Sequence, residues 1–171
     1  MPWSARFAPM DARPAKATAT ARRRSKTAAP SAQAVGLLIV AHDELGKTLI
    51  RCAAHMLGAV PAGVASIAVA ADVDPEVLLK NIRRRIAAVD SGAGVLILTD
   101  MLGGTPSNVA TRALMRGHVE GLSGASLPMV MRALTYRNNS LATVVAKAAA
   151  GGQDGIVHIH STAGTHAPSG N

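Results

Sequence analysis

The sequence predicts an α/β fold, in which an open and mostly parallel sheet carries helices on both of its faces. Apolar runs of strand length alternate along the chain with stretches of helical periodicity, which is the pattern of a parallel α/β sheet. The first run, residues 35–41, is apolar throughout, as expected of a strand buried on both faces. Helix caps, glycine and proline separate successive segments. A chain of 171 residues has room for one such domain.

The first predicted helix follows the first strand, spans residues 44–57 and ends at Gly58. Helical spacing places four side chains on its apolar face: Leu45, Leu49, Cys52 and Met56. We therefore expect Cys52 to pack in the core. As the single cysteine of the chain it cannot form an internal disulfide, which favours a reducing, cytoplasmic setting.

A second strand, residues 64–70, precedes a helix that runs to about residue 89. Asp74 and Pro75 mark the start of this helix, because aspartate caps free amide groups and proline is favoured in the first turn. Its expected apolar face consists of Val77, Leu78, Ile82, Ile86 and Val89. Its basic residues are Lys80, Arg83, Arg84 and Arg85. An acidic partner could bind them, but a solvated helix face is the more common explanation.

The second half of the domain continues the alternation. A third strand is predicted at residues 95–99, and Thr105 and Pro106 are expected as N-cap and first residue of a helix that ends near Gly117. The later elements are a short strand, two helices and a final edge strand, at residues 118–122, 126–134, 140–150 and 155–161. Gly151 and Gly152 are expected to end the last helix.

The net charge of +8 lies mostly in the first 34 residues, which carry seven Lys and Arg against one Asp, whereas the rest of the chain carries eleven against nine. This segment has no hydrophobic period and cannot bury enough surface to offset its ordering entropy. We expect a disordered tail at 1–34, a folded domain at 35–161 and a flexible tail at 162–171.

The basic tail has several possible functions. Its composition also fits an organelle transit peptide, and its run of arginines could bind nucleic acid or an anionic membrane. We prefer a solvated extension or an over-long translation start, and expect no nucleic-acid partner. The tail lacks the apolar run of a secretory signal, and no stretch of the chain approaches the ~20 apolar residues of a membrane helix.

Two reactive side chains, His42 and Asp100, follow the first and third strands directly. If the strand order begins 2-1-3-4, as in flavodoxin-like sheets, these strands are neighbours whose helices leave on opposite faces. Side chains at their carboxyl ends then meet in the ligand crevice. A carboxylate that accepts the proton of one imidazole nitrogen fixes the tautomer and leaves a lone pair on the other. The pair therefore predicts a nucleophilic His42 held by Asp100.

A glycine-rich turn follows Asp100. Gly103 and Gly104 allow a close backbone approach, and the helix that starts at Thr105 and Pro106 presents free amide groups to an anion. The Thr105 hydroxyl is either a further donor or only the helix cap. This arrangement predicts phosphoryl transfer. Because GxxxxGK[ST] and GxGxxG are both missing, a protein is the expected phosphoryl donor.

No metal or cofactor is predicted. His158 and His160 would share one face of the last strand, but the sequence offers no third ligand beside them. His55 is expected on a helix and His118 at the start of a strand, and neither is a candidate for the reactive site.

Three segments resemble the mannose-type EIIA domain of the bacterial phosphoenolpyruvate-dependent sugar phosphotransferase system (PTS): LLIVAHDELGKTLIRCAAHMLG, VLILTDMLGGTPSNVA and EGLSGASLPMVMRAL. The similarity covers about residues 35–160. It implies the sheet predicted above with an antiparallel edge strand, and often a dimer. It also implies that His42 Nε2 takes a phosphoryl group from phospho-HPr and passes it to an EIIB partner, while Asp100 holds Nδ1.

The resemblance also assigns two loops. It implies that Gly103, Gly104, Thr105 and Pro106 border the phosphate. A second loop near the site matches Gly124, Ser126, Leu127 and Pro128. The GGTP sequence argues against the related phosphotransfer subunit of dihydroxyacetone kinase.

Two alternatives remain open. The chain could be a stand-alone regulatory EIIA whose phosphorylation state controls a partner protein, or, less favoured, a flavodoxin-like module that binds a small nucleotide. No EIIB domain follows, so the acceptor is expected to be a separate chain. We expect a bacterial cytoplasmic protein that forms a homodimer and reaches the membrane only through a permease complex.

Overall fold

The computed structural model describes residues 33–59 and 62–159. The expected tails at 1–34 and 162–171 therefore lie outside the described residues, except for Gln33 and Ala34. In chain order the elements are β1 (Gly36–His42), α1 (Leu45–Leu57), β2 (Val64–Val69), α2 (Pro75–Val89), β3 (Val95–Thr99), α3 (Thr105–Thr111), β4 (Val119–Ser123), α4 (Leu127–Tyr136) and α5 (Leu141–Asp154). None of the described helices is both long and apolar enough to cross a membrane.

The four strands form one open sheet in the order β2-β1-β3-β4, and every neighbouring pair is parallel. This confirms the predicted order. The register pairs His42 with Val69 of β2, and Val40 with Thr99 of β3. The carboxyl ends of β1 and β3 therefore lie side by side at one edge of the sheet, where ligands of such folds bind.

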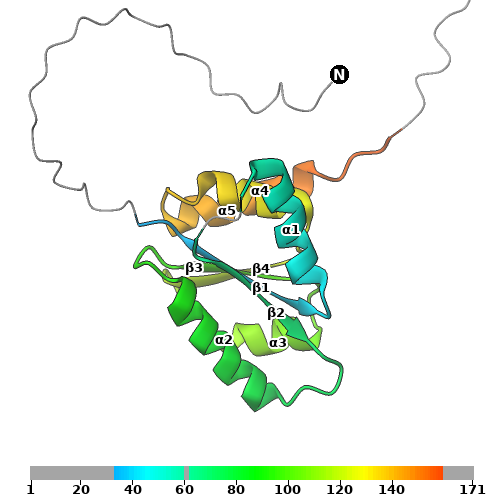
Figure 1. The fold of residues 1–171 in the computed structure, drawn as a ribbon, viewed down its shortest axis with the longest axis vertical. Coiled ribbons are helices and arrows are strands. Elements are labelled where there is room, and N and C mark those ends of the chain that lie inside the picture. The colour runs from blue at the N-terminus through cyan, green and yellow to red at the C-terminus, as the bar shows by residue number, and fades with distance from the viewer. Residues whose placement is uncertain (1–32, 60–61, 160–171) are drawn as a thin grey trace, which may run out of the picture. The chain divides into compact units, whose positions relative to one another are not determined.

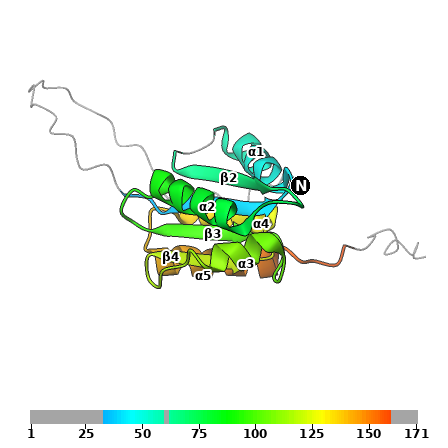
Figure 2. The ribbon, with the colours of Figure 1, turned by 90° about the horizontal axis from the view of Figure 1, so that it is seen from below.

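Helices cover both faces of the sheet. Helices α1, α4 and α5 pack on one face, and α2 and α3 on the other (Figure 1). The view from below shows α2 and α3 in front of the strands (Figure 2). Along β1, Leu37, Ile39 and Ala41 join the first hydrophobic cluster, while Leu38 and Val40 join the second. The strand is thus buried on both faces, as its continuous apolar run predicted.

The predicted N-cap of α2 is confirmed, and the serines expected to start α4 and α5 are N-caps as well. Asp74 Oδ1 accepts hydrogen bonds from the backbone N–H groups of Glu76 at 2.7 Å and Val77 at 3.4 Å. Ser126 caps α4 and Ser140 caps α5 in the same way. Each cap satisfies amide groups that the first helical turn leaves without a partner.

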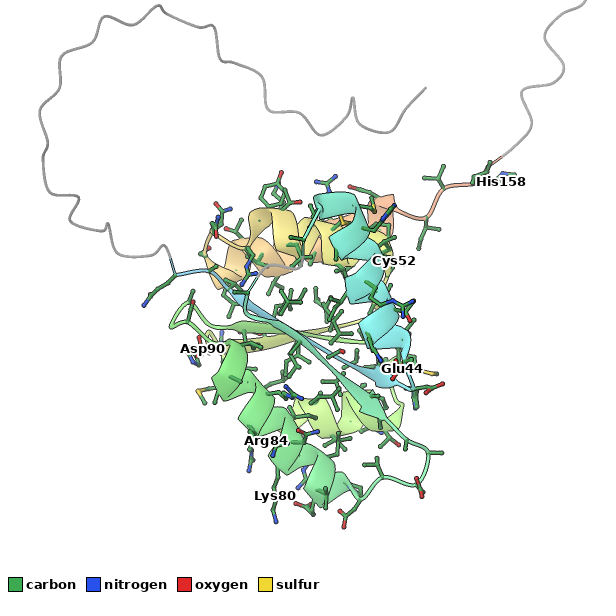
Figure 3. All side chains as sticks on the ribbon, in the orientation of Figure 1. Glu44, Cys52, Lys80, Arg84, Asp90 and His158 are labelled. Atoms are coloured by element: carbon green, nitrogen blue, oxygen red, sulfur yellow. The ribbon has the colours of Figure 1, made fainter. Side chains whose placement is uncertain are left out.

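The predicted buried face of α1 is wrong. The helix packs on the sheet through Gly46 and Ala53, whose small size allows a close approach. Leu49 is only partly buried, while Leu45 and Met56 are exposed. Cys52 is exposed as well, rather than in the core, and it projects from the solvent side of α1 (Figure 3). Helical spacing alone did not distinguish these two stripes.

The predicted face of α2 needs one correction: Leu78, Ile82 and Val89 are buried, but Val77 is exposed. Lys80 and Arg84 extend away from the sheet (Figure 3), in agreement with a solvated basic face.

Helix α3 is shorter than predicted and begins one residue earlier. Gly104, not Thr105, is its N-cap, and the helix ends at Thr111 instead of near residue 117. The chain must reverse before β4, since the Met115 N–H donates to the Val119 carbonyl in an isolated antiparallel bridge. This turn takes the place of the expected last helical turns.

Helix α5 continues through the glycines that were expected to end it. A Cβ on Gly151 would lie 2.9 Å from the Pro128 carbonyl oxygen and would also overlap Arg132. Glycine at this position therefore allows α4 and α5 to pack closely, and the helix extends to Asp154. The missing side chain serves packing between helices rather than helix termination.

The expected antiparallel edge strand at 155–161 is not found among the described residues. Gly155 is the C-cap of α5, and residues 156–159 have no regular secondary structure. Ile156 is 86% exposed and Ile159 is 89% exposed. Because α5 runs to Asp154 and the chain leaves the helical layer after its C-cap (Figure 1), β4 stays at the edge of the sheet. Residues 160 and 161 lie outside the described part.

Candidate active site at the carboxyl ends of β1 and β3

The structure brings His42 and Asp100 into direct contact, although 58 positions separate them in the chain. His42 Nδ1 lies 2.7 Å from Asp100 Oδ2, and the His42 backbone N–H donates to the same oxygen at 2.9 Å. The other carboxylate oxygen, Oδ1, accepts a hydrogen bond from the Met101 N–H at 2.9 Å. Both carboxylate oxygens are therefore engaged, so the Asp100 side chain is held in one orientation.

These contacts keep Asp100 ionised. Partial burial of the carboxyl group raises its pKa, but the hydrogen bonds from His42 and Met101 outweigh this effect and hold the pKa below its usual value. A carboxylate can only accept hydrogen bonds, so the Nδ1 atom of the neutral His42 ring carries the proton. The lone pair then lies on Nε2. The His42 side chain is 44% exposed, against 12% for Asp100, so Nε2 is accessible to a partner.

The glycine-rich turn lies against the imidazole. A Cβ on Gly104 would lie only 3.0 Å from His42 Cε1, so the backbone can approach the ring this closely only without a side chain. Asn108 holds the turn from within α3: its side-chain Nδ2 donates to the Gly103 carbonyl at 3.0 Å, and its backbone N–H donates to the Gly104 carbonyl at 2.9 Å. Sequence reasoning did not assign a role to Asn108, although the residue closes the GGTPSN motif.

Thr105 and Pro106 form the first turn of α3. Thr105 is exposed, and no side chain caps this helix, so the Thr105 hydroxyl does not act as the helix cap. The other predicted role of the Thr105 hydroxyl, donation of a hydrogen bond to a bound anion, therefore stays a prediction. Pro106 is buried beneath the turn.

Ser126 belongs to a second loop that is tied to the site through backbone atoms. The Gly124 N–H donates to the Asp100 carbonyl at 3.1 Å, and the Ala125 N–H donates to the Thr99 carbonyl at 3.0 Å. The Ser126 side chain itself accepts from the Met129 N–H at 3.4 Å as the cap of α4. Within the described part of the chain, no hydrogen bond joins Ser126 to His42.

On the β2 side of His42 the surface forms an open depression of about 390 Å³. It is lined by His42, Asp43 and residues 68–71, which are all alanine or valine. Asp43 has a φ of 48°, in the left-handed region, and its N–H donates to the Val69 carbonyl at 3.2 Å. Neither Asp43 nor the end of β2 was singled out from the sequence, because alanines and an isolated aspartate carry no recognisable pattern.

The other histidines lie elsewhere. His118 Nε2 pairs with Asp90 Oδ2 at 2.9 Å, beside the start of β4, and His55 lies in the last turn of α1. His158 belongs to no strand, and His160 lies outside the described residues. Over 33–59 and 62–159, no group of three His, Cys, Asp or Glu side chains is arranged to hold a metal ion.

Comparisons with known proteins identify the family and the fold of this chain. The family model EIIA-man, whose description is "PTS system fructose IIA component", matches residues 36–150. The "PTS system mannose-specific EIIAB component" of Escherichia coli strain K12 is 29% identical over 125 residues, which cover 71% of this chain and 38% of that protein. The protein of the same name from Shigella flexneri gives the same values. The chain thus spans well under half the length of these curated relatives.

Solved structures show the same fold. The EIIA component of the phosphotransferase system from Streptococcus agalactiae has 26% identity and a TM-score of 0.65, over 72% of this chain and 96% of that one. A PTS IIA protein associated with the fucose utilization operon of Streptococcus pneumoniae has a TM-score of 0.63 at 21% identity, over 74% and 93% of the two chains, and at that identity shows the fold alone. Because the family model spans more than half of the chain, this protein belongs to the mannose-type EIIA family of the sugar phosphotransferase system.

Proposed function

We propose that this chain is a phosphocarrier in which His42 Nε2 accepts a phosphoryl group from phospho-HPr and passes it to an EIIB partner. One observation carries the proposal: the 2.7 Å contact between His42 Nδ1 and Asp100, which leaves Nε2 as an accessible nucleophile. Membership of the EIIA family supports a carrier role in the sugar PTS. The curated relatives are EIIAB components, which supports an EIIB protein as acceptor.

In the accepting step, the Nε2 lone pair forms a bond to phosphorus. The bond between phosphorus and the donor breaks, and its electron pair stays on the donor. The proton on His42 Nδ1 remains in the hydrogen bond with Asp100, so no proton has to leave the site. The positive charge that develops on the imidazole is stabilised by the Asp100 carboxylate. In the second step the acceptor's nucleophile attacks the same phosphorus, and the electron pair returns to Nε2.

The glycine-rich turn would border the transferred group. Gly104 lies against His42 Cε1, the ring carbon next to Nε2, so backbone groups can approach a phosphoryl group on that nitrogen. The exposed Thr105 hydroxyl is available as a donor because it does not cap α3. Hydrogen-bond donors near a phosphoryl group stabilise the charge on its oxygens.

The test is phosphorylation from labelled phosphoenolpyruvate in the presence of enzyme I and HPr. Wild-type protein should take up acid-labile label, and His42→Ala should take up none. His118→Ala is a matched control, because His118 also pairs with an aspartate, at 2.9 Å, but lies away from the glycine-rich turn. Label that persists in His42→Ala and disappears in His118→Ala would show that His118, and not His42, carries the phosphoryl group. Addition of a purified EIIB protein should then remove the label from the wild type.

Two further expectations accompany this proposal. A homodimer predicts about twice the chain mass in light scattering coupled to gel filtration. A cytoplasmic location predicts recovery in the soluble fraction of the native host after cell breakage.

A further inference from the structure

Asp43, directly after His42, has a backbone conformation that aspartate adopts at a cost. Among the residues that the structure describes, it is the one non-glycine residue with a positive φ, at 48°. Its N–H group donates to the Val69 carbonyl at the end of β2, so this backbone conformation is fixed by a hydrogen bond that continues the pairing of β1 with β2. Glycine would adopt the same φ without strain. The property that aspartate adds at this position is its carboxylate.

The position of that carboxylate sets it apart from its neighbours. His42 and Asp43 contribute the two polar side chains that line the 390 Å³ depression, whose other lining residues are alanine and valine. Glu44 next to it forms an ion pair with Lys47 at 2.8 Å, and Asp100 is engaged by His42 and Met101. Over residues 33–59 and 62–159, no hydrogen bond or ion pair engages the Asp43 carboxylate. It is exposed and uncompensated beside the reactive ring.

A negative charge at this point matters for any protein that delivers or removes a phosphoryl group at His42. The phosphoryl group is itself anionic, so the approach of a phosphorylated partner places like charges close together. A cationic side chain of the partner, seated in the depression, would neutralise Asp43 and the phosphoryl group at once. Charge complementarity of this kind raises association rates and rejects partners that lack the cation.

We propose that Asp43 is a specificity-determining residue that accepts an ammonium or guanidinium group of the phosphoryl-transfer partner, in the depression between His42 and the end of β2. The inference rests on the proposed function, since it assumes that a protein partner transfers phosphate at His42. It goes further, because it states that the partner's contact surface is cationic and that Asp43 is the residue that recognises this charge.

The test is the salt dependence of phosphoryl transfer from HPr that enzyme I and phosphoenolpyruvate have phosphorylated. Rate constants are compared at about 20 mM and about 300 mM salt, where exposed charges are weakly and strongly screened. Asp43→Asn removes the charge but tolerates the left-handed backbone. It should lower the rate about fivefold at low salt and have little effect at high salt, as expected for loss of one charge at an interface rim.

Two control variants separate the effect of the Asp43 charge from the effect of its backbone conformation. Asp43→Gly removes both the charge and the strain, and should behave like Asp43→Asn. Glu44→Gln removes the neighbouring carboxylate, which is paired with Lys47 and does not line the depression, and should change the rate less than twofold.

The inference is overturned if Asp43→Asn keeps the wild-type rate and salt dependence, if only Asp43→Gly differs from wild type, or if Glu44→Gln slows transfer equally. Each of these results leaves the proposed function in place, provided that His42 still becomes labelled. A wild-type protein that takes up no label at His42 refutes the proposed function instead. Circular dichroism spectra of all variants confirm that the folds are comparable.

Discussion

Replacing Asp100 by asparagine is the sharpest test of how the site works. The two side chains have the same shape, but asparagine presents one acceptor oxygen and one NH₂ donor. Asp100 Oδ2 accepts from the ring and backbone nitrogens of His42, and Oδ1 accepts from Met101 N–H. Asparagine cannot accept the hydrogen bonds from His42 and the one from Met101 at the same time, because its NH₂ group would then face an N–H donor on one of the two sides.

Both orientations of the amide predict slower transfer. If the NH₂ faces the ring, His42 Nδ1 must become the acceptor, so the proton moves to Nε2 and the nucleophilic lone pair is lost. If the oxygen faces the ring, the tautomer survives but the charge-assisted bond is lost, which is worth about 1.5–3 kcal/mol, or roughly 10- to 150-fold in rate. A wrong tautomer caused by the same substitution in a serine protease costs about 10⁴-fold. We expect a decrease of about 10- to 10⁴-fold, depending on the orientation that the amide adopts.

The assay is rapid-quench transfer from labelled phospho-HPr to the Asp100→Asn protein. Asp90→Asn is the matched control, because Asp90 also pairs with a histidine, His118, at a separate site. It should transfer at the wild-type rate. Transfer by Asp100→Asn within about threefold of wild type, with an intact fold, would show that the carboxylate does not set the tautomer.

Three further outcomes are expected. Gly104→Ala places a Cβ 3.0 Å from His42 Cε1 and should slow phosphorylation about tenfold while the thermal midpoint changes little. Gly151→Ala overpacks α4 against α5, so denaturant titration should show a loss of about 1–3 kcal/mol, with phosphorylation of the folded protein unchanged. Because the folded-state pKa of Asp100 lies below the usual pKa of an aspartate, its contribution to stability is complete above that usual pKa and is lost as pH falls through the folded-state pKa. Acid titration of Asp100→Asn should lack this part of the pH dependence, and an unchanged acid transition would contradict the pKa shift.

Much of the fold could be predicted from the sequence because its signals are local. Strands buried on both faces leave continuous apolar runs, and Asp74 and Ser140 cap their helices through contacts within three residues. The face of α1 could not be predicted in this way. Cys52 and Ala53 lie on stripes of similar periodicity, and Ala53 is buried because a small residue fits against the sheet. The end of α5 was misplaced for the same reason, since Gly151 packs against α4.

Residue patterns alone were enough to predict that a histidine and an aspartate end two apolar strands and that a glycine-rich turn follows the second. These are properties of short segments, set by hydrophobic period and turn chemistry. The contact between His42 and Asp100 was predicted on an assumed strand order, and the fold was needed to establish that order. That Gly104 lies against the ring, and that Asp43 stands uncompensated in a depression formed with β2, became evident only from the tertiary structure. Those relations depend on strand register and on close packing between distant segments, which no local pattern encodes.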